Sequence, residues 1–466
     1  MAGWLALSAY CGLFSALWLW LATRWIRNLA SLPETCSWVQ AADLVSRQPW
    51  GRRLTLWLVL AASATGLEVI RGRFLSGFPW NFYGISQWQN APLIQIASVT
   101  GIFGVTFLVY WVSLALLGAL LQVRRSSENR FGWTADLRIP LVVLLVVVGW
   151  GFRRIMTAPP EGPATTLGLV QPSIPQTLIW DDAANPERFA KVFALTETAL
   201  AGRPEVLIWP EGSLPDITEA QFRAVTGLTQ KAGADWIFGT GYGREVEGRR
   251  EHYNAALLVD PSGRVVDRYH KRRLVIFGEF IPFEYTLPIM KWLTPIGSSF
   301  TPGKEAKAFR VGSGTNTVVS PVICFEDMFP ETTRDHVTPE TDFLLELTNN
   351  GWFGESSAHW QHSAGAVFRA VENGVPVVRC ANNGLTCWID EFGRTRDLLG
   401  KGGNVYAPGV LLTRVPGRLE GQPRPLTWYH RQGDVFGGLC VVVMMGMVIW
   451  DISGRRRAVR PNPVPL

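Results

Sequence analysis

Three polar residues stand out because each follows an apolar segment with the composition of a β-strand. Cys324 ends the run TVVSPVIC and is followed within three residues by two acids. Glu211 follows VLIWP, and Lys271 follows DRYH. Such positions present a side chain at the end of a strand instead of packing it in a core. A thiolate beside a base and a cation is suited to acyl transfer, so we expect these residues to form one site.

Each of the three residues has a role that its chemistry predicts. We expect Cys324 to be the nucleophile, with its thiolate favoured by Lys271 and by the positive end of a helix that begins there. We expect Glu211 to be the general base, with a pKa raised by burial beneath Trp209. Lys271 is expected to stabilise the oxyanion, with the backbone N–H of Phe325 as a second donor. Taken singly, each residue also has a plainer interpretation. Cys324 could be an inert buried cysteine, Glu211 a solvated loop residue and Lys271 part of a solvated basic run.

The elements that must position these residues lie between the linker TAPPEGPATT and the stretch PGRLEGQPRP, which bound a domain at about residues 165–415. Short apolar strands alternate there with helical patterns, which predicts an α/β domain with many strands. The glycines of GTGYG, residues 239–243, indicate a turn. Helices are expected at 185–201, 219–231 and 359–373. Strands are expected in TTLGLVQPSI, EVLIWPEG, ADWIFGTGYG, YNAALLVD, TNTVVSPVIC, DFLLELTNN, VPVVRCANN and LTCWIDEFG.

The rest of the chain has the composition of a membrane protein. Hydrophobic residues make up 47% of the 466 residues, and 21 are tryptophan. The first 23 residues carry no charge and lack the basic leader of a signal peptide, so we expect a retained helix. Further apolar runs cover 54–70, 74–123, 139–152 and 435–450. We therefore predict about four spans within residues 1–157 and a C-terminal span at 434–454.

Arginine clusters orient these spans. Cytoplasmic loops carry an excess of Arg and Lys, and the strongest clusters alternate along the chain so that the large domain lies outside the cytoplasm. The N-terminus is then external as well. The clusters that support this orientation are Arg24 with Arg27, Arg52 with Arg53, Arg124 with Arg125, and Arg455 to Arg457. Those that oppose it are Arg71, Arg73, Arg153 and Arg154.

Several classes of protein are disfavoured. The net charge of +6 gathers near the spans, where it meets anionic lipid, and no nucleic-acid-binding motif accompanies it. Six cysteines do not make a disulfide framework in a chain of this length. Cys380 and Cys387 are expected on paired strands as core residues, with a disulfide as the alternative. His359 and His362 have no acidic motif beside them, so we expect them to line a helix and predict no metal and no cofactor.

The motifs IWPEG, YHKRRLVIFGEFIPF and VICFED resemble the three catalytic blocks of the nitrilase superfamily. That resemblance implies an α-β-β-α sandwich with a triad of Glu211, Lys271 and Cys324. GFPWNFYGISQ, QPSIPQTLIW, TNNGWFG and the flanking apolar segments are similar more specifically to the apolipoprotein N-acyltransferase family. We therefore expect a multi-pass helical membrane bundle joined to a nitrilase-like α/β domain.

The resemblance also implies supporting and substrate-binding residues. Glu279 is expected to orient Lys271 or the acceptor amine, with a structural ion pair as the alternative. Glu326 and Phe325 are expected to support the site around the nucleophile. Three aromatic residues resemble the lining of the family's acyl pocket, and an ordinary aromatic core is the alternative: Trp180, Trp352 and Phe353.

The chain differs from the family pattern in three respects. Phe325 stands where tyrosine is common after the cysteine, and Asn350 stands where aspartate is common before Trp-Phe-Gly. About three N-terminal helices of the family pattern have no counterpart, which agrees with the external N-terminus expected from charge. The triad is retained, so we expect these differences to affect rate and substrate fit more than the chemistry.

The expected reaction is a ping-pong acyl transfer in the bacterial inner membrane, with the catalytic domain on the periplasmic side. The resemblance implies that a phospholipid, phosphatidylethanolamine, donates an acyl group to Cys324, and that the α-amino group of a diacylated apolipoprotein accepts it. One alternative is a membrane-tethered amidase or nitrilase that uses water as the acceptor. The other is an inactive lipid-binding scaffold.

Overall fold

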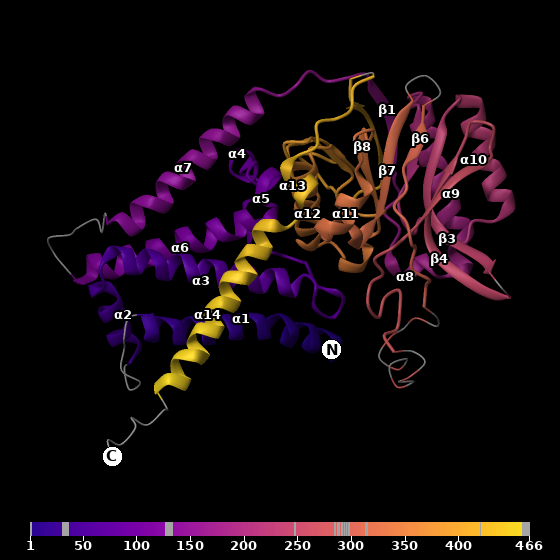
Figure 1. Ribbon diagram of the computed structural model, residues 1–466. Helices are drawn as coiled ribbons and strands as arrows, with labels where there is room; N and C mark the ends of the chain where they lie inside the picture. Colours follow the sequence, from indigo (N-terminus) through magenta and orange to yellow (C-terminus); the bar gives the residue numbers. More distant parts are fainter. Residues whose placement is uncertain are drawn as a thin grey trace, which may run out of the picture. The chain divides into compact units, whose positions relative to one another are not determined.

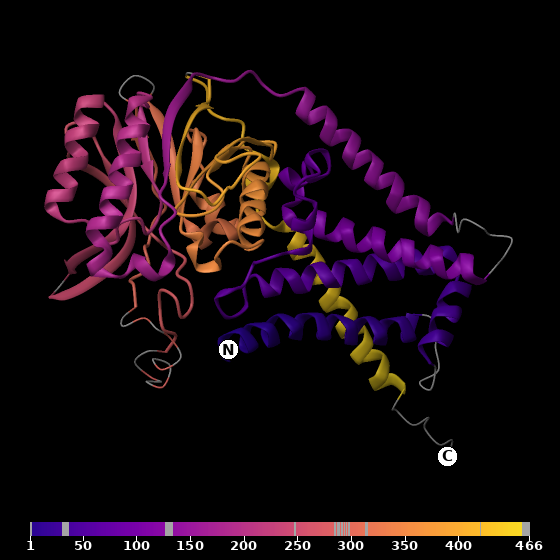
Figure 2. The ribbon, with the colours of Figure 1, turned by 180° about the vertical axis from the view of Figure 1, so that it is seen from behind.

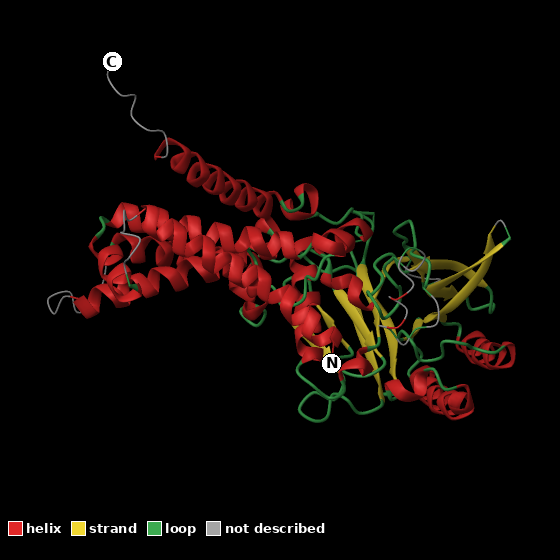
Figure 3. Ribbon diagram, turned by 90° about the horizontal axis from the view of Figure 1, so that it is seen from below, coloured by secondary structure: helices red, strands yellow, loops and turns green. Residues whose placement is uncertain are grey.

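The computed structural model describes residues 2–29, 37–125, 134–246, 248–283, 286, 289, 292, 294, 296, 299–312, 316–419 and 421–458. These residues form two compact units. One unit comprises residues 1–157 and 432–466, and the other comprises residues 158–431. Every described strand lies in the second unit, whereas the first is built of helices (Figure 3).

The first unit is a bundle around helix α3 (Trp50–Arg71), which packs against α1 (Ala2–Leu29), α6 (Ile102–Arg125), α7 (Ala135–Met156) and α14 (Val435–Ala458). Among the described residues, these five helices are long and apolar enough to cross a membrane. Helix α2 (Trp38–Arg47) links α1 to α3. Short helices fill the segment between α3 and α6 (Figure 1): η1 (Phe74–Ser76), η2 (Tyr83–Gln87), α4 (Ala91–Ile94) and α5 (Ala97–Thr100).

Two buried ion pairs hold polar side chains inside this bundle. Arg53 on α3 donates to both carboxylate oxygens of Asp136 on α7, at 2.9 and 2.6 Å. One turn from the other end of α3, Glu68 accepts from Arg71 at 3.3 Å and from the Thr106 hydroxyl at 3.0 Å. Charged groups inside a membrane bundle need such partners, because unpaired charge is costly in an apolar medium.

The second unit contains two sheets of six described strands each. The first sheet has the order β12-β1-β2-β3-β4-β5, and the second has the order β11-β10-β9-β8-β7-β6. The strands of the first sheet are β1 (Ala164–Gln171), β2 (Val206–Trp209), β3 (Asp235–Val246), β4 (Arg249–Val259), β5 (Val265–His270) and β12 (Gly409–Pro416). Those of the second are β6 (Phe309–Val311), β7 (Thr317–Ile323), β8 (Phe343–Thr348), β9 (Val377–Ala381), β10 (Cys387–Ile389) and β11 (Thr395–Leu398).

The two sheets pack face to face, with helices on their outer faces (Figure 2). Alternate residues of both sheets meet in one core, such as Leu167 and Ile208 from the first and Val319 and Leu345 from the second. The other alternating set of the first sheet packs under α9 (Asn185–Ala201) and α10 (Glu219–Ala232). Helices α11 (Pro330–His336) and α12 (Ala358–Asn373) cover the second sheet. The predicted combination of a helical membrane bundle with an α-β-β-α sandwich is confirmed.

The remaining short elements lie in the loops of this unit. They are α8 (Gln176–Ile179), η3 (Asp182–Ala184), η5 (Cys324–Met328), η6 (Asn350–Phe353) and α13 (Trp428–Gln432). The eight predicted strands and three predicted helices are all present. Cys380 and Cys387 are buried free thiols on the paired strands β9 and β10, as expected, so the disulfide alternative is wrong.

The sequence assigns GTGYG both to the strand ADWIFGTGYG and to a turn; the strand is confirmed and the turn is wrong. Residues 239–243 lie inside β3 and pair with β4 along their whole length. The glycines are needed for close approach, because a Cβ at Gly239 would lie 2.8 Å from Cα of Glu211. A Cβ at Gly241 would lie 3.1 Å from the carbonyl oxygen of Pro215. The bare face of β3 therefore gives room to the loop that carries Glu211.

Candidate active site

The three residues singled out in the sequence meet where strands end. Glu211 follows β2, Lys271 follows β5, and Cys324 follows β7. Strands β1, β2 and β3 run parallel in one sheet and β7, β8 and β9 run parallel in the other. Ligands of such sheets bind beyond the carboxyl ends of the strands, and the two sheets here bring these ends together.

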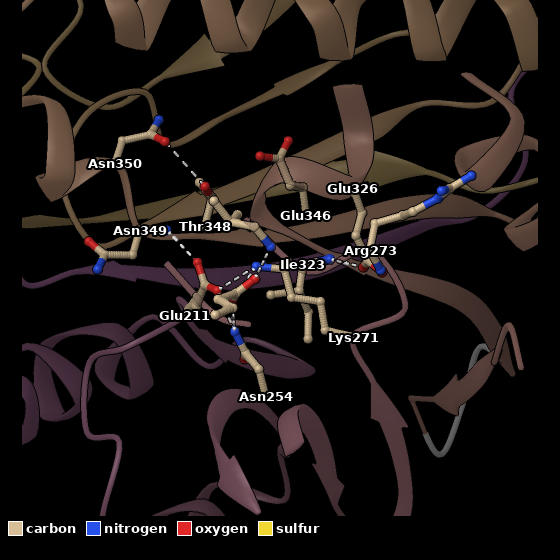
Figure 4. Close-up of polar contacts among 12 residues, drawn as sticks. Glu211, Asn254, Lys271, Arg273, Ile323, Glu326, Glu346, Thr348, Asn349 and Asn350 are labelled. Atoms are coloured by element: carbon tan, nitrogen blue, oxygen red, sulfur yellow. Dashed lines mark hydrogen bonds and ion pairs between the residues drawn. The ribbon is translucent and has the colours of Figure 1, made fainter. Parts of the chain in front are cut away.

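Lys271 lies at the centre of an ionic cluster (Figure 4). Its Nζ is 3.1 Å from Oε1 of Glu211 and 2.7 Å from Oε1 of Glu279, and its side chain is only 1% exposed. Burial opposes its positive charge, but the carboxylates of Glu211 and Glu279 hold the pKa of Lys271 well above its ordinary value. Lys271 is therefore a permanent cation in the site.

Asn254 joins the two carboxylates. Its Nδ2 donates to Glu211 Oε1 at 2.7 Å and to Glu279 Oε1 at 2.8 Å. The second oxygen of Glu211 accepts from the backbone N–H of Asn349 at 3.0 Å, and that of Glu279 accepts from the N–H of Val275 at 2.9 Å. Every carboxylate oxygen of the cluster thus has a donor, which fixes the orientation of both acids.

Cys324 begins η5 in a strained backbone conformation. Its φ is 51°, in the left-handed region that non-glycine residues rarely adopt. Burial and the Glu211 carboxylate raise the pKa of the Cys324 thiol, although the Lys271 ammonium acts in the opposite direction. Lys271 thus favours the thiolate as expected, but burial and the Glu211 carboxylate outweigh it. The thiol is protonated at neutral pH and needs a base.

Glu326 fixes the loop of Cys324 against the end of β5. Its buried carboxylate accepts from the hydroxyl of Tyr269 at 2.7 and 2.8 Å and from the backbone N–H groups of Arg272, Arg273 and Ile323 at 2.6, 3.1 and 2.7 Å. Ile323 and Arg272 are the immediate neighbours of Cys324 and Lys271 in the sequence. Glu326 thus ties the strand that precedes Cys324 to the strand that precedes Lys271.

The charges of this site favour proton transfer within it. One cation, Lys271, stands beside two carboxylates, Glu211 and Glu279, so a thiolate at Cys324 would add a third negative charge. If the thiol proton moves to Glu211, the total charge does not change. A buried site disfavours the creation of net charge, so the arrangement supports a nucleophile and base that act as a pair.

Family comparisons agree with this geometry. A family model described as carbon-nitrogen hydrolase matches residues 166–405, and one described as apolipoprotein N-acyltransferase N-terminal domain matches residues 1–115. The apolipoprotein N-acyltransferase of Geobacter metallireducens is 32% identical to this chain, over 97% of this chain and 86% of that protein. The chain belongs to the apolipoprotein N-acyltransferase family.

This chain is also similar to a second curated relative and to a solved structure. The apolipoprotein N-acyltransferase of Bradyrhizobium diazoefficiens is 30% identical, over 90% of this chain and 77% of that protein. Among solved structures, an amidase from Nesterenkonia sp. matches with a TM-score of 0.40 and 19% identity, covering 56% of this chain and 93% of the amidase. Together with its five apolar helices, membership of the apolipoprotein N-acyltransferase family makes this chain a multi-pass membrane protein.

The three aromatic residues expected in the acyl pocket of this apolipoprotein N-acyltransferase family member are exposed. Trp180 is 58% exposed, Trp352 is 55% exposed and Phe353 is 41% exposed, so the alternative of an ordinary core is wrong. Trp180 lines a cavity of about 270 Å³. The other lining residues are Pro215, Asp216, Gly241, Tyr242, Gly243, His252, Ser299 and Phe300. Gly241 of this lining pairs with Asn254 across β3 and β4.

Sequence reasoning missed Asn254, Thr348 and Asn349 as members of the site. Asn254 is a polar residue within the apolar strand YNAALLVD, and that interruption was a usable signal. Thr348 and Asn349 lie in the segment TNNGWFG that the family resemblance had already marked. Their contacts depend on the pairing of β7 with β8, which places Leu347 beside Ile323.

His359 and His362 lie buried on α12. They line this helix as expected, but two acids that the sequence does not place beside them approach in space: His362 with Asp327 and Glu346 offers possible ligand atoms within 4.8 Å of one another. However, the Arg379 guanidinium contacts both carboxylates, at 3.0 Å for Asp327 and closely for Glu346. A protein cation thus already neutralises these acids, which disfavours a metal ion there.

Proposed function

We propose that this chain transfers an acyl group from a membrane phospholipid to the α-amino group of the diacylglyceryl-cysteine at the N-terminus of apolipoproteins. Phosphatidylethanolamine is the proposed donor. The observation that carries the proposal is the cluster of a neutral thiol, a fixed ammonium and two carboxylates in a member of the apolipoprotein N-acyltransferase family. Glu211, Lys271 and Cys324 are the proposed catalytic residues.

In the first half-reaction, the thiol of Cys324 gives its proton to Glu211 as the sulfur attacks the carbonyl carbon of the phospholipid ester. The oxyanion that forms is stabilised by the ammonium of Lys271. When the intermediate collapses, the ester C–O bond breaks and Glu211 returns the proton to the lysophospholipid oxygen. A thioester on Cys324 remains.

In the second half-reaction, the α-amino group of the acceptor attacks the thioester carbonyl and Glu211 takes a proton from the nitrogen. The C–S bond breaks, the amide leaves, and the sulfur regains its proton. Glu279 holds Lys271 in place through both steps, since it contacts the ammonium at 2.7 Å. Amines attack thioesters readily, so transfer prevails over hydrolysis when water is kept from the site.

We place residues 165–415 outside the cytoplasm, on the periplasmic side of the bacterial inner membrane. The Arg clusters near the end of α1, at the start of α3 and at the end of α6 support this orientation. The spans within residues 1–157 and at 434–454 then serve to keep the enzyme where both lipid substrates reside. We assign the exposed rings of Trp180, Trp352 and Phe353 to contact with those lipids.

The test is to incubate the purified chain with radiolabelled phosphatidylethanolamine and a synthetic diacylated lipopeptide. The expected product is an N-acylated peptide, and intact-mass measurement of the enzyme without the peptide should find one added acyl group. Cys324→Ala should abolish both. Release of free fatty acid without N-acylated peptide would identify a hydrolase. The absence of any adduct would favour a lipid-binding scaffold.

A further inference from the structure

The two carboxylate oxygens of Glu211 are held in different ways. Oε1 accepts from Nδ2 of Asn254 at 2.7 Å and from the ammonium of Lys271 at 3.1 Å (Figure 4). Oε2 accepts from the backbone N–H of Asn349 at 3.0 Å, which is its one hydrogen-bond donor among the described residues. An oxygen whose two lone pairs already accept hydrogen bonds, one of them from a cation, is a poor acceptor for a further proton. Oε2 is therefore the oxygen of Glu211 that is available for the thiol proton.

The side chain of Asn349 holds the peptide that carries this N–H. Asn349 follows β8 and is buried. Its Oδ1 accepts from the backbone N–H of Gly351 at 3.1 Å and from Nδ2 of Asn382 at 3.0 Å. Its Nδ2 donates to Oε1 of Gln176 at 2.8 Å. Both ends of the amide are thus bound, so the backbone of Asn349 has little freedom to turn.

Asn382 is anchored in turn to the segment that follows β1. Its Oδ1 accepts from the backbone N–H of Ile174 at 3.0 Å, and its Nδ2 donates to the carbonyl oxygen of Ile174 at 2.9 Å. The two hydrogens of Nδ2 therefore serve Ile174 and Asn349. We call Gln176, Asn349 and Asn382 the amide network. It joins segments that follow β1, β8 and β9, which belong to both sheets.

The outer end of the amide network lies on a short helix. Gln176 is half-buried and is the first residue of α8, and Trp180 directly follows the last residue of α8. The ring of Trp180 is exposed and is assigned above to contact with lipid. The amide network therefore connects the base to a segment that faces the substrates.

We propose that Asn349 is a positioning residue for the general base, because its backbone N–H aims Oε2 of Glu211 as the oxygen that takes the thiol proton. The side chains of Asn382 and Gln176 keep that N–H in place. The same oxygen returns the proton to the leaving oxygen of the ester, so a misplaced base impairs two proton transfers. The proposal rests on Cys324 and Glu211 as nucleophile and base of the proposed function.

The experiment compares two octanoyl esters in single-turnover acylation of the full-length, detergent-solubilised chain. The p-nitrophenyl ester releases a stable phenolate that needs no proton, whereas dioctanoyl phosphatidylethanolamine releases an alkoxide that must be protonated. Acylation is followed by intact mass of the enzyme with both esters, and by p-nitrophenol release with the first. The first ester thus reports removal of the thiol proton, and the second reports both proton transfers.

The Gln176 variants form a matched pair. Gln176→Met keeps a side chain of similar length but removes the acceptor of the Asn349 amide. We expect acylation by the p-nitrophenyl ester to slow by about tenfold, a part of the ~100-fold that misplacement of a reacting group by about 1 Å can cost. Gln176→Glu keeps an acceptor oxygen and should retain the wild-type rate. Its added negative charge disfavours a thiolate, so the charge does not itself preserve the rate.

The second ester separates positioning from loss of folded enzyme. With dioctanoyl phosphatidylethanolamine the loss in Gln176→Met should rise to about 100-fold, because two proton transfers are impaired and not one. A smaller fraction of folded enzyme would slow both esters equally. Thr177→Val changes an exposed residue of the same helix and should leave both rates unchanged.

Asn349→Ala tests the centre of the amide network. It removes all three side-chain hydrogen bonds and should slow acylation by the p-nitrophenyl ester at least as much as Gln176→Met does. Adding Gln176→Met to Asn349→Ala should cause no further loss, because the contact between the two side chains is already absent.

Wild-type rates in Gln176→Met would overturn the proposal. Equal slowing by Gln176→Met and Gln176→Glu, or equal slowing with the two esters, would do so as well. If Asn349→Ala does not fold, the Gln176 pair still decides the outcome. A wild-type chain that the p-nitrophenyl ester acylates and the phospholipid does not would refute the proposed function alone, and the Gln176 pair would still decide the role of Asn349. A wild-type chain that neither ester acylates would overturn both.

Discussion

Replacing Lys271 with methionine tests the ionic cluster directly. The ammonium lies 2.7 Å from Glu279 and 3.1 Å from Glu211, and at an effective dielectric constant of about 20 these contacts are worth about 6 and about 5 kcal/mol before desolvation is subtracted. Breaking a buried pair by removing one partner costs about 3 to 5 kcal/mol. Asn254 still donates to both acids in the variant, so we expect the lower end of that range.

The same change should affect the chemistry by a separate route. Loss of an oxyanion donor lowers kcat by about 10²- to 10³-fold. Since Lys271 opposes the rise in the pKa of the Cys324 thiol, its removal raises that pKa further and alkylation of the thiol should slow. The assays are thermal unfolding, transfer of acyl groups to a diacylated lipopeptide, and the rate of alkylation against pH.

A distant ion pair provides the control. Arg223 on α10 pairs with Glu219 at 2.9 Å in an exposed position. Arg223→Met should cost under about 1 kcal/mol and leave alkylation and transfer unchanged. If Lys271→Met unfolds like the control and its thiol is alkylated at the wild-type rate, Lys271 does not interact electrostatically with the nucleophile and the account of the cluster is wrong.

Three further predictions concern other parts of the catalytic unit. Burial lowers the pKa of His336 to about 3, so its folded state binds fewer protons than the unfolded state below pH 6.5, and stability falls as pH drops from 6.5 toward 3. His336→Phe should reduce the dependence of the unfolding free energy on pH in that window by up to about 1.4 kcal/mol per pH unit, as measured by urea denaturation at several pH values. An unchanged pH dependence would contradict this prediction. Asn254→Asp puts a third carboxylate between two others and should reduce kcat by at least about tenfold, and wild-type kcat would show that the bridge is unimportant. Gly239→Ala places a Cβ 2.8 Å from the backbone of Glu211 and should reduce kcat. The control Gly227→Ala has no atom within 4 Å of the new Cβ and should leave kcat unchanged. Equal kcat values for the two variants would refute the close approach.

Local patterns were sufficient for most elements of the fold. Strands such as Phe343–Thr348 and helices such as Asn185–Ala201 have strong periodicity or apolar content, which depends on neighbours within a few residues. The strands that escaped prediction are of another kind. Phe309–Val311, Thr395–Leu398 and Gly409–Pro416 are edge strands, so their conformation depends on the strand they pair with more than on their own composition.

GTGYG illustrates the same limit within the site. Three glycines in five residues read locally as a turn, yet the segment is a strand whose missing side chains admit the Glu211 loop. No feature of the five residues indicates that a loop from another part of the chain needs that space. A high glycine content indicates that the backbone can adopt many conformations. Only the packed structure shows that these glycines serve to let another segment approach the strand closely.

The sequence by itself determined the apolar spans, the alternating strands, and the types of residue at three strand ends. These are properties of composition and short-range order. The tertiary structure alone decided that Asn254 bridges two acids and that burial and the Glu211 carboxylate raise the pKa of the Cys324 thiol. The state of Cys324 depends on its burial and on its distance from Glu211 and Lys271, which lie 113 and 53 positions away in the sequence. Electrostatic energies depend on those distances in space, and no local pattern encodes them.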